Sequence, residues 1–364
     1  MTVAAHQPAC CPGHAGAQAG ACGIDVHAHL VPEHFPAYLG RGNAALWPST
    51  ADAPPAKGLC HRQVLVGGKH YRTVSEACWS PSRRLADLPE MGLAAQVISP
   101  MPELLSYWLD LPDAQALIRF LNEQAAMMCA ESGGRLSGLA AVPLQDVDAA
   151  IAELRHAREV LGLVGVELGS NVNGRVIGDA QFEPFFEACV ALDMPVFVHA
   201  VKPAGMDRLV GPAPLQQVLA YPTDVGLAAA SVITGGLLLR HPGLRIAFSH
   251  GGGTLAMLLP RLQQGWQVFP ALAGSIAASP AEQARRLYYD TLVYDGPTLR
   301  HLVATFGAQA LMLGTDYPFN FHEPRPLQRL DDAGLDADTW QALAQGNARR
   351  FLGTAWAARH KDLA

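Results

Sequence analysis

The sequence contains few charged residues and no excess of positive charge. Of its 364 residues, 16% are charged, and 26 Lys and Arg stand against 32 Asp and Glu, which gives a net charge of −6. Proteins that bind nucleic acid neutralise phosphates with a basic surface. We therefore expect no nucleic-acid partner.

Long apolar runs and a regular cysteine pattern are also missing. The longest mostly apolar stretch, from Leu227 to Leu239, is interrupted by Ser231 and Thr234 and is shorter than the roughly 20 residues that cross a bilayer. The seven cysteines are odd in number and irregularly spaced, which excludes a disulfide scaffold. We expect a soluble cytoplasmic protein with no membrane partner.

The N-terminal segment lacks the basic start and apolar core of a secretory signal. We interpret residues 1–22 as a tail that precedes a single domain over residues 23–364. A metal site in this tail is less favoured, because no paired C-x-x-C spacing joins its metal-binding side chains. Those side chains are Cys10, Cys11, His14 and Cys22.

From Gly23 onward, short apolar runs alternate with longer segments of helical period, as in βα units around a parallel sheet. About eight repeats predict one (β/α)₈ TIM barrel. The predicted strands are Ile24–His27, Ala95–Ser99, Leu139–Pro143, Val164–Leu168, Pro195–His199, Arg245–Ser249, Tyr288–Leu292 and Leu311–Gly314. The predicted helices include Pro112–Glu131, Val147–Leu161, Pro184–Leu192 and Asp224–Arg240.

Residues 32–81 fit no βα unit. They are rich in Pro, Gly and Trp, and only Gln63–Val66 has the pattern of a strand. Long connections inside a compact domain are commonly lids or binding loops, and a plain surface excursion is the alternative. We expect an insertion over the mouth of the barrel.

The first predicted strand ends at His27, and His29 follows two residues later. Residues two apart on a strand point to the same face, so both imidazoles can reach one ion. Three more polar residues, His199, His250 and Asp316, end or directly follow later predicted strands. Because such strand ends meet at one mouth in barrel enzymes, we predict a metal site formed by His27, His29, His199 and Asp316.

Three imidazoles and one carboxylate suit zinc, or another first-row ion, better than calcium or magnesium. We therefore expect one divalent ion, best assigned as Zn²⁺, with a water in an open position. His250 is the candidate base, and Asp316 is expected to help move protons. The glycines Gly251–Gly253 would let substrate approach closely, and a phosphate-binding turn is the less favoured alternative.

These residues resemble the amidohydrolase-related family of metal-dependent decarboxylases over Gly23 to Leu352. The resemblance implies a mononuclear zinc on the four predicted ligands, with His250 activating water. It also implies a homodimer in which Arg84 binds a substrate carboxylate and Arg261 reaches the neighbouring chain's site, a task suited to guanidinium groups. Either arginine could instead serve a structural ion pair or a solvated helix face. The matching motifs are Asp25–His29, Cys78–Arg84, Leu105–Trp108, Phe197–His199, His250–Gly253, Gly314–Phe319 and Gly346–Ala348.

Two positions depart from the family pattern. Where the family has an aromatic residue after His199, this sequence has Lys202, which either binds a different acid or points to solvent. Glu167 stands where the resemblance leads us to expect a neutral amide. It could bridge a second metal, although hydrogen bonding behind a ligand histidine is the preferred interpretation.

The sequence thus predicts a zinc-dependent, non-oxidative decarboxylase of an unsaturated, aromatic or heteroaromatic carboxylic acid in a catabolic pathway. The alternative is a hydrolase or hydratase of the same type, which two metals per chain would favour. A scaffold without catalysis would hold no tightly bound metal. The predicted catalytic residues are His250 and Asp316, and the predicted substrate-binding residues are Arg84, Arg261, Lys202 and Phe319.

Overall fold

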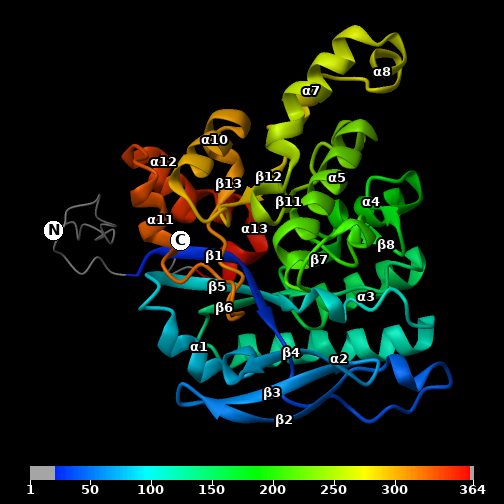
Figure 1. The fold of residues 1–364 in the computed structure, drawn as a ribbon, viewed down its shortest axis with the longest axis vertical. Coiled ribbons are helices and arrows are strands. Elements are labelled where there is room, and N and C mark those ends of the chain that lie inside the picture. The colour runs from blue at the N-terminus through cyan, green and yellow to red at the C-terminus, as the bar shows by residue number, and fades with distance from the viewer. Residues whose placement is uncertain (1–20, 361–364) are drawn as a thin grey trace, which may run out of the picture.

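A barrel of eight parallel strands forms the centre of the computed structural model, which describes residues 21–360 (Figure 1). The barrel closes because Val26 N donates to the carbonyl of Leu313 at 2.9 Å and Ala28 bridges Tyr317. The predicted (β/α)₈ TIM barrel is therefore confirmed. In order around the barrel, the strands are β1 (Gly23–Leu30), β5 (Leu93–Pro100), β6 (Leu136–Ala140), β7 (Gly165–Gly169), β10 (Val196–His199), β11 (Ile246–Phe248), β12 (Tyr288–Asp290) and β13 (Leu311–Met312).

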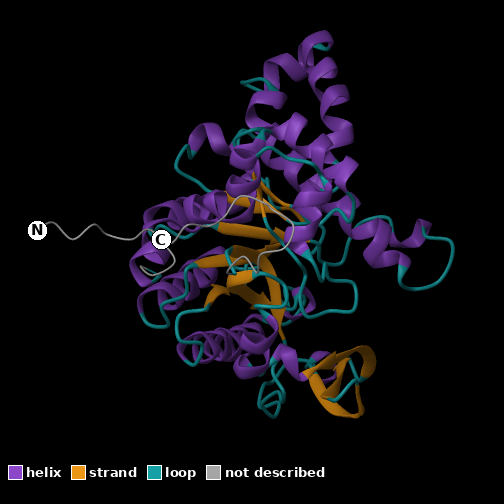
Figure 2. Cartoon of the chain, turned by 90° about the vertical axis from the view of Figure 1, so that its left-hand side faces the viewer, coloured by secondary structure: helices purple, strands orange, loops and turns teal. Residues whose placement is uncertain are grey.

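Helices form the layer outside the strands (Figure 2). The largest apolar cluster packs between the two layers; Leu117, Ile118 and Leu121 of one helix belong to it. No helix in the described part of the chain is long and apolar enough to cross a membrane. The helices are α1 (Pro81–Asp87), α2 (Leu111–Ala130), α3 (Val147–Glu159), α4 (Glu183–Ala191), α5 (Tyr221–Thr234), α6 (Leu237–Arg240), α7 (Leu255–Val268), α8 (Pro270–Ser275), α9 (Pro280–Ala284), α10 (Gly296–Phe306), α11 (Pro326–Asp332), α12 (Ala337–Gln341) and α13 (Asn347–Arg359).

A second apolar cluster joins residues of the barrel strands to the C-terminal helix α13. Phe351 and Trp356 contribute the large side chains of that helix. The indole of Trp356 donates to Ser137 Oγ, near the start of β6, at 3.1 Å. The last helix thus fastens the end of the chain to the strands.

The insertion after β1 contains a three-stranded antiparallel sheet of β2 (Ser49–Ala56), β3 (Leu59–Val66) and β4 (Lys69–Ser75), which stands apart from the barrel in Figure 2. The sequence indicated only the end of β3 as a strand. Two-residue turns, Lys57-Gly58 and Gly67-Gly68, connect the three strands, and all four turn residues have positive φ, as tight hairpins require. Buried Val64 and Val74 fix the sheet to the main apolar cluster. A short hairpin of β8 (Asn171–Val172) and β9 (Arg175–Val176) follows β7.

Helices α7 and α8 project from the body of the molecule as an arm (Figure 1). The arm carries large exposed apolar side chains, among them Met257, which is 74% exposed, and Phe269, which is 60% exposed. At the N-terminus, most of the predicted tail, with the Cys10, Cys11 and His14 side chains, lies outside the described residues.

Candidate metal centre and pocket

Four predicted ligands converge at one point of the barrel. One nitrogen each from His27, His29 and His199 and one oxygen from Asp316 all lie within 4.8 Å of one another. The three histidines are buried, and they come from β1 and from the end of β10. The spatial convergence that the strand-end rule predicted is therefore present.

Hydrogen bonds fix the orientation of each imidazole. His27 Nδ1 lies 2.6 Å from Asp290 Oδ2, and His199 Nδ1 lies 2.9 Å from the carbonyl of Ala200. His29 Nδ1 faces Ser99 Oγ at 3.3 Å. Because these neighbours accept hydrogen bonds, the protonated nitrogen is Nδ1, and the lone pair of each Nε2 is directed toward the other ligands.

Without a cation, this arrangement of Nε2 atoms is unfavourable. The Nε2 atoms of His27 and His29 are 3.2 Å apart, so two lone pairs face each other. The buried Nε2 of His199 and Oδ1 of Asp316 have no hydrogen-bond partner of acceptable geometry in the described part of the chain. Buried polar atoms normally have partners, and a divalent ion would satisfy all four at once. The residues present therefore fit a metal.

The charge of the cluster follows from its surroundings. Burial, together with nearby His250, lowers the pKa of His199 well below its ordinary value, so this ring is neutral at physiological pH. Burial alone would raise the pKa of Asp316, but the nearby imidazole of His29, followed by that of His27, holds that pKa below its ordinary range. A neutral imidazole and an ionised carboxylate are the forms that bind metal. Burial lowers the pKa of His27, but the hydrogen bond to Asp290 and the nearby carboxylate charges together outweigh burial and raise it, so metal binding would displace a proton from this ring.

His250 lies beside the cluster, with its ring centroid 4.9 Å from that of His199. Burial, followed by the effect of His27, lowers the pKa of His250 to about 4. Both His250 and Asp316 have positive φ, 55° and 63°, a strained conformation that clusters at functional sites. Asp290 holds the turn by accepting from the backbone N–H of His250 and Gly251.

The glycine run after His250 serves packing. A Cβ on Gly251 would lie 2.7 Å from Val293, one on Gly252 would lie 2.5 Å from Tyr289, and one on Gly253 would lie 1.8 Å from the carbonyl of Pro222. None of these glycines lines the pocket. The expectation that the run admits substrate is wrong, because the three positions are filled by the protein itself.

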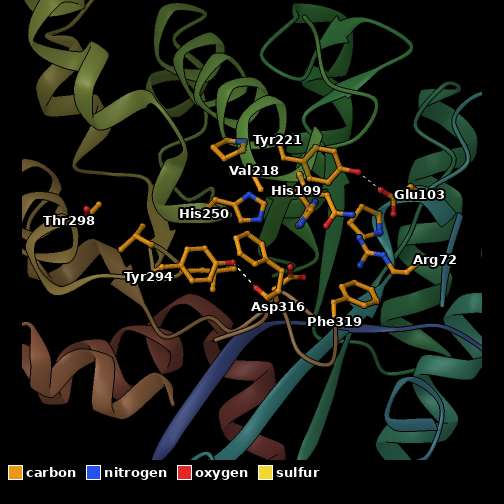
Figure 3. A pocket seen from close by; sticks show the side chains of 16 residues that line it. Arg72, Glu103, His199, Val218, Tyr221, His250, Tyr294, Thr298, Asp316 and Phe319 are labelled. Carbon is orange, nitrogen blue, oxygen red and sulfur yellow. Dashed lines mark hydrogen bonds between the residues drawn. The ribbon is translucent and has the colours of Figure 1, made fainter. Parts of the chain in front are cut away.

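A cavity of about 270 Å³ opens beside the cluster (Figure 3). Its polar wall contains Arg72, Glu103 and Tyr221, and its opposite side carries Tyr294 and Thr298. His199, His250 and Asp316 lie between the two sides, and Phe319 lies below Arg72. The other lining residues are Pro102, Gln217, Val218, Pro222, Leu292, Val293 and Phe321.

Arg84 was predicted to bind substrate, but the structure places it away from the pocket. It is fully buried and donates to Gln96 Oε1 at 2.7 Å and to the carbonyl of His29. Gln96 in turn donates to Asp25, which accepts from Thr315. This network ties β1, β5 and the segment after β13 together beneath the ligands, so Arg84 is positioned for a structural role.

Arg72 of β4 is the arginine that lines the pocket, and no sequence motif indicated it. Its guanidinium lies 4.0 Å from the ring centroid of Phe319, which stacks on His29. Within residues 21–360 no carboxylate forms an ion pair with Arg72 and no acceptor takes its hydrogen bonds. Phe319, which the sequence did suggest, lies in the pocket as expected.

Lys202 and Arg261 do not line the cavity. Lys202 is exposed, and its ammonium lies 3.5 Å from the centroid of the Trp108 ring. Arg261 is exposed on the α7 arm.

Glu167 is fully buried at the end of β7, and its Oε1 lies 3.8 Å from His29 Nδ1. It therefore faces the side of His29 opposite the converging Nε2 atoms, and it is not one of the four clustered ligands. Burial raises the pKa of Glu167 well above its ordinary value. A carboxylate in this place is poorly situated to bridge a second ion beside the first.

Ligands at strand ends, a neutral histidine beside them and an adjoining pocket define a metal-dependent enzyme of the TIM-barrel class. The family model described as Amidohydrolase matches residues 24–354. The chain therefore belongs to the amidohydrolase family, as the motifs predicted.

Several characterised proteins are similar over most of the chain. The 2-amino-3-carboxymuconate-6-semialdehyde decarboxylase of Dictyostelium discoideum is 33% identical over 332 residues, which covers 91% of each chain. A 5-carboxyvanillate decarboxylase structure from Sphingomonas paucimobilis aligns with a TM-score of 0.68 and 26% identity, over 74% of this chain and 82% of that one. The Metarhizium anisopliae IDCase structure has a TM-score of 0.76 at 20% identity, over 93% and 98% of the chains, a likeness of fold.

Proposed function

We propose that this protein is a metal-dependent carboxy-lyase that removes CO₂, without oxidation, from an unsaturated, aromatic or heteroaromatic carboxylic acid in a catabolic pathway. The observation that carries the proposal is the pocket, in which a guanidinium without an anionic partner lies beside a cluster of metal ligands. The decarboxylases among the relatives support the same reaction class.

The ion would be held by His27, His29, His199 and Asp316. When bound, it supplies a positive charge that polarises a substrate oxygen and stabilises negative charge as CO₂ departs. Zinc is our proposal for its identity, because three imidazoles and one carboxylate match its preferences, and manganese is the alternative to test.

The surrounding residues have separable tasks. Arg72 binds a carboxylate of the substrate, and the ring of Phe319, held between Arg72 and His29, keeps that guanidinium in place. Leu292, Val293 and Phe321 provide an apolar wall that excludes water.

Proton movement is assigned to His250. Loss of CO₂ leaves an electron pair on carbon, and that carbon must gain a proton. Because burial lowers its pKa to about 4, the ring of His250 is neutral at pH 7. It can take a proton from a water molecule or from a substrate hydroxyl and deliver that proton to the carbon that loses CO₂. Asp316, the neighbouring carboxylate in the pocket, would assist this transfer.

We also propose a cytoplasmic homodimer. The exposed Met257, Leu258 and Phe269 of the projecting arm form apolar surface that a second copy would cover. Arg261 lies on the same arm, away from its own pocket, which supports its contribution to the partner's site.

The test is metal analysis of the purified protein combined with a CO₂-release screen of benzoate, pyridine and muconate-type acids. We expect about one ion per chain and CO₂ from at least one acid. Two ions per chain with hydrolysis and no CO₂ would favour the hydrolase alternative. A protein that binds no metal would refute both.

A further inference from the structure

Glu103 belongs to the pocket but has no task in the reaction described above. It lies in a short turn, Pro102–Leu104, directly after β5, and its side chain lines the cavity. Its Oε1 accepts hydrogen bonds from the hydroxyls of Tyr71 and Tyr221, which are 3.3 Å apart (Figure 3 shows the Tyr221 bond). Three segments far apart in the sequence therefore hold this carboxylate in place.

The second oxygen of Glu103 is unused. In the described part of the chain, no donor reaches Oε2, although the carboxylate faces the cavity. A carboxylate offers about four acceptor positions, and a partly buried one gains strongly from a further donor. Because the protein supplies donors only to Oε1, a donor to Oε2 would come from whatever fills the pocket.

A purely electrostatic role as counter-ion to Arg72 fits the geometry less well. The two groups interact through space, yet their charged atoms do not approach within the 4.0 Å of an ion pair. Two opposite charges that line one pocket without pairing leave each of them available to a ligand. Burial, with Glu103 adding to the effect, raises the pKa of both Tyr71 and Tyr221, so the phenols stay protonated and Oε1 stays occupied.

We propose that Glu103 is a specificity-determining residue whose Oε2 accepts a hydrogen bond from an amino or hydroxyl group of the substrate. The pocket would thus select acids that carry a carboxylate for Arg72 and an N–H or O–H donor for Glu103. This inference rests on the proposed function, because it describes the acid that the same site would decarboxylate.

The test is calorimetric binding to the metal-loaded protein, which needs no turnover. The probes are isophthalate and its 4- and 5-substituted hydroxy, amino and methyl derivatives. The methyl group is close in size to the donor groups but cannot donate. We expect at least one hydroxy or amino isomer to bind about tenfold or more tightly than its methyl counterpart. Glu103→Leu should reduce that ratio to about twofold or less.

Two variants serve as controls. Tyr221→Phe keeps the carboxylate and removes one donor to Oε1, so the preference for donor-bearing ligands should persist. Glu90→Gln removes an exposed carboxylate outside the pocket and should leave every affinity unchanged.

Three results would overturn the proposal. One is a wild type that does not distinguish donor-bearing from methyl ligands at either position. Another is a Glu103→Leu protein that retains the affinity ratio between donor-bearing and methyl ligands. The third is a Glu103→Leu protein whose affinity falls equally for both ligand types, which would indicate a structural role. If no acid releases CO₂ but the donor preference is present, the reaction assignment fails while the assignment of Glu103 stands.

Discussion

Exchanging each of two arginines for methionine separates a structural role from a substrate-binding role. Arg84→Met is expected to weaken the fold, and Arg72→Met is expected to weaken catalysis with the fold intact. Methionine keeps much of the side-chain volume, so neither change creates a large cavity. The contrast is informative because Arg72 lines the pocket, whereas Arg84 is buried in a hydrogen-bond network with Gln96 and His29.

The expected cost at Arg84 follows from its buried contacts. Its guanidinium donates to Gln96 Oε1 and to the carbonyl of His29, and a hydrogen bond to a charged group contributes about 1.5–3 kcal/mol. Burial lowers the pKa of Arg84, so holding the charge there is itself unfavourable and offsets part of the loss. We expect urea unfolding to show a net loss of about 2–4 kcal/mol.

The cost at Arg72 should appear in kinetics. Its guanidinium has no anionic partner in the described protein, so its removal should change the free energy of unfolding by less than about 1 kcal/mol. Loss of a charged contact to a substrate carboxylate, about 3–4 kcal/mol, corresponds to roughly a 10²- to 10³-fold fall in kcat/KM.

The assay compares urea unfolding and kcat/KM for both variants at equal metal content, with the acid that releases CO₂ fastest. If Arg84→Met were as stable as the wild type but fully metal-loaded and inactive, while Arg72→Met kept its activity, the assignment made here would be reversed.

Three further predictions follow from the site. The metal content of His199→Ala should fall from about one ion per chain to near zero in elemental analysis after gel filtration. Full retention of the metal would remove His199 from the ligand set. His250→Asn should keep its metal and lose at least about 10²-fold in turnover. The variant should also lose less stability in acid than the wild type. In the wild type, the unfolded His250 takes up a proton near pH 6.5 and the folded one near pH 4, so the free energy of unfolding falls as the pH falls between these values. Urea titrations should show the wild type losing about 3 kcal/mol more than His250→Asn over that range, and parallel curves would contradict the burial argument. Finally, co-expressed Arg261→Ala and His250→Asn chains should recover activity that neither has alone, because one site of the mixed dimer has both residues; no recovery would refute the exchange of Arg261.

The ligand set could be predicted from the sequence because the rule that finds it is local. His27 and His29 follow from the period of a strand, and His199 and Asp316 end or directly follow apolar runs. The same signal marks Asp290, which ends β12 and orients His27, but without a motif it could not be distinguished from an ordinary polar residue.

The pocket wall could not be predicted in this way. Arg72 reaches the cavity only because two tight turns fold the insertion into a sheet and buried Val64 and Val74 anchor that sheet to the barrel. Arg84 lies in the motif Cys78–Arg84, which matches the family pattern, but the motif does not reveal that the Arg84 side chain is buried. Tertiary packing decides whether Arg72 in β4 or Arg84 in α1 lines the pocket. Local sequence patterns do not contain that information.

The geometry of the metal centre depends on how the barrel closes as much as on the identity of the ligands. Each imidazole is oriented by a partner from a different part of the barrel: Asp290 from β12 for His27, Ser99 from β5 for His29, and the carbonyl of Ala200 after β10 for His199. A slip of one residue between β1 and β5 would turn His27 and His29 to the other face of the strand. The network of Arg84, Gln96 and Asp25 crosses that same strand pair, so its buried hydrogen bonds hold the register on which the convergence of the three Nε2 atoms depends.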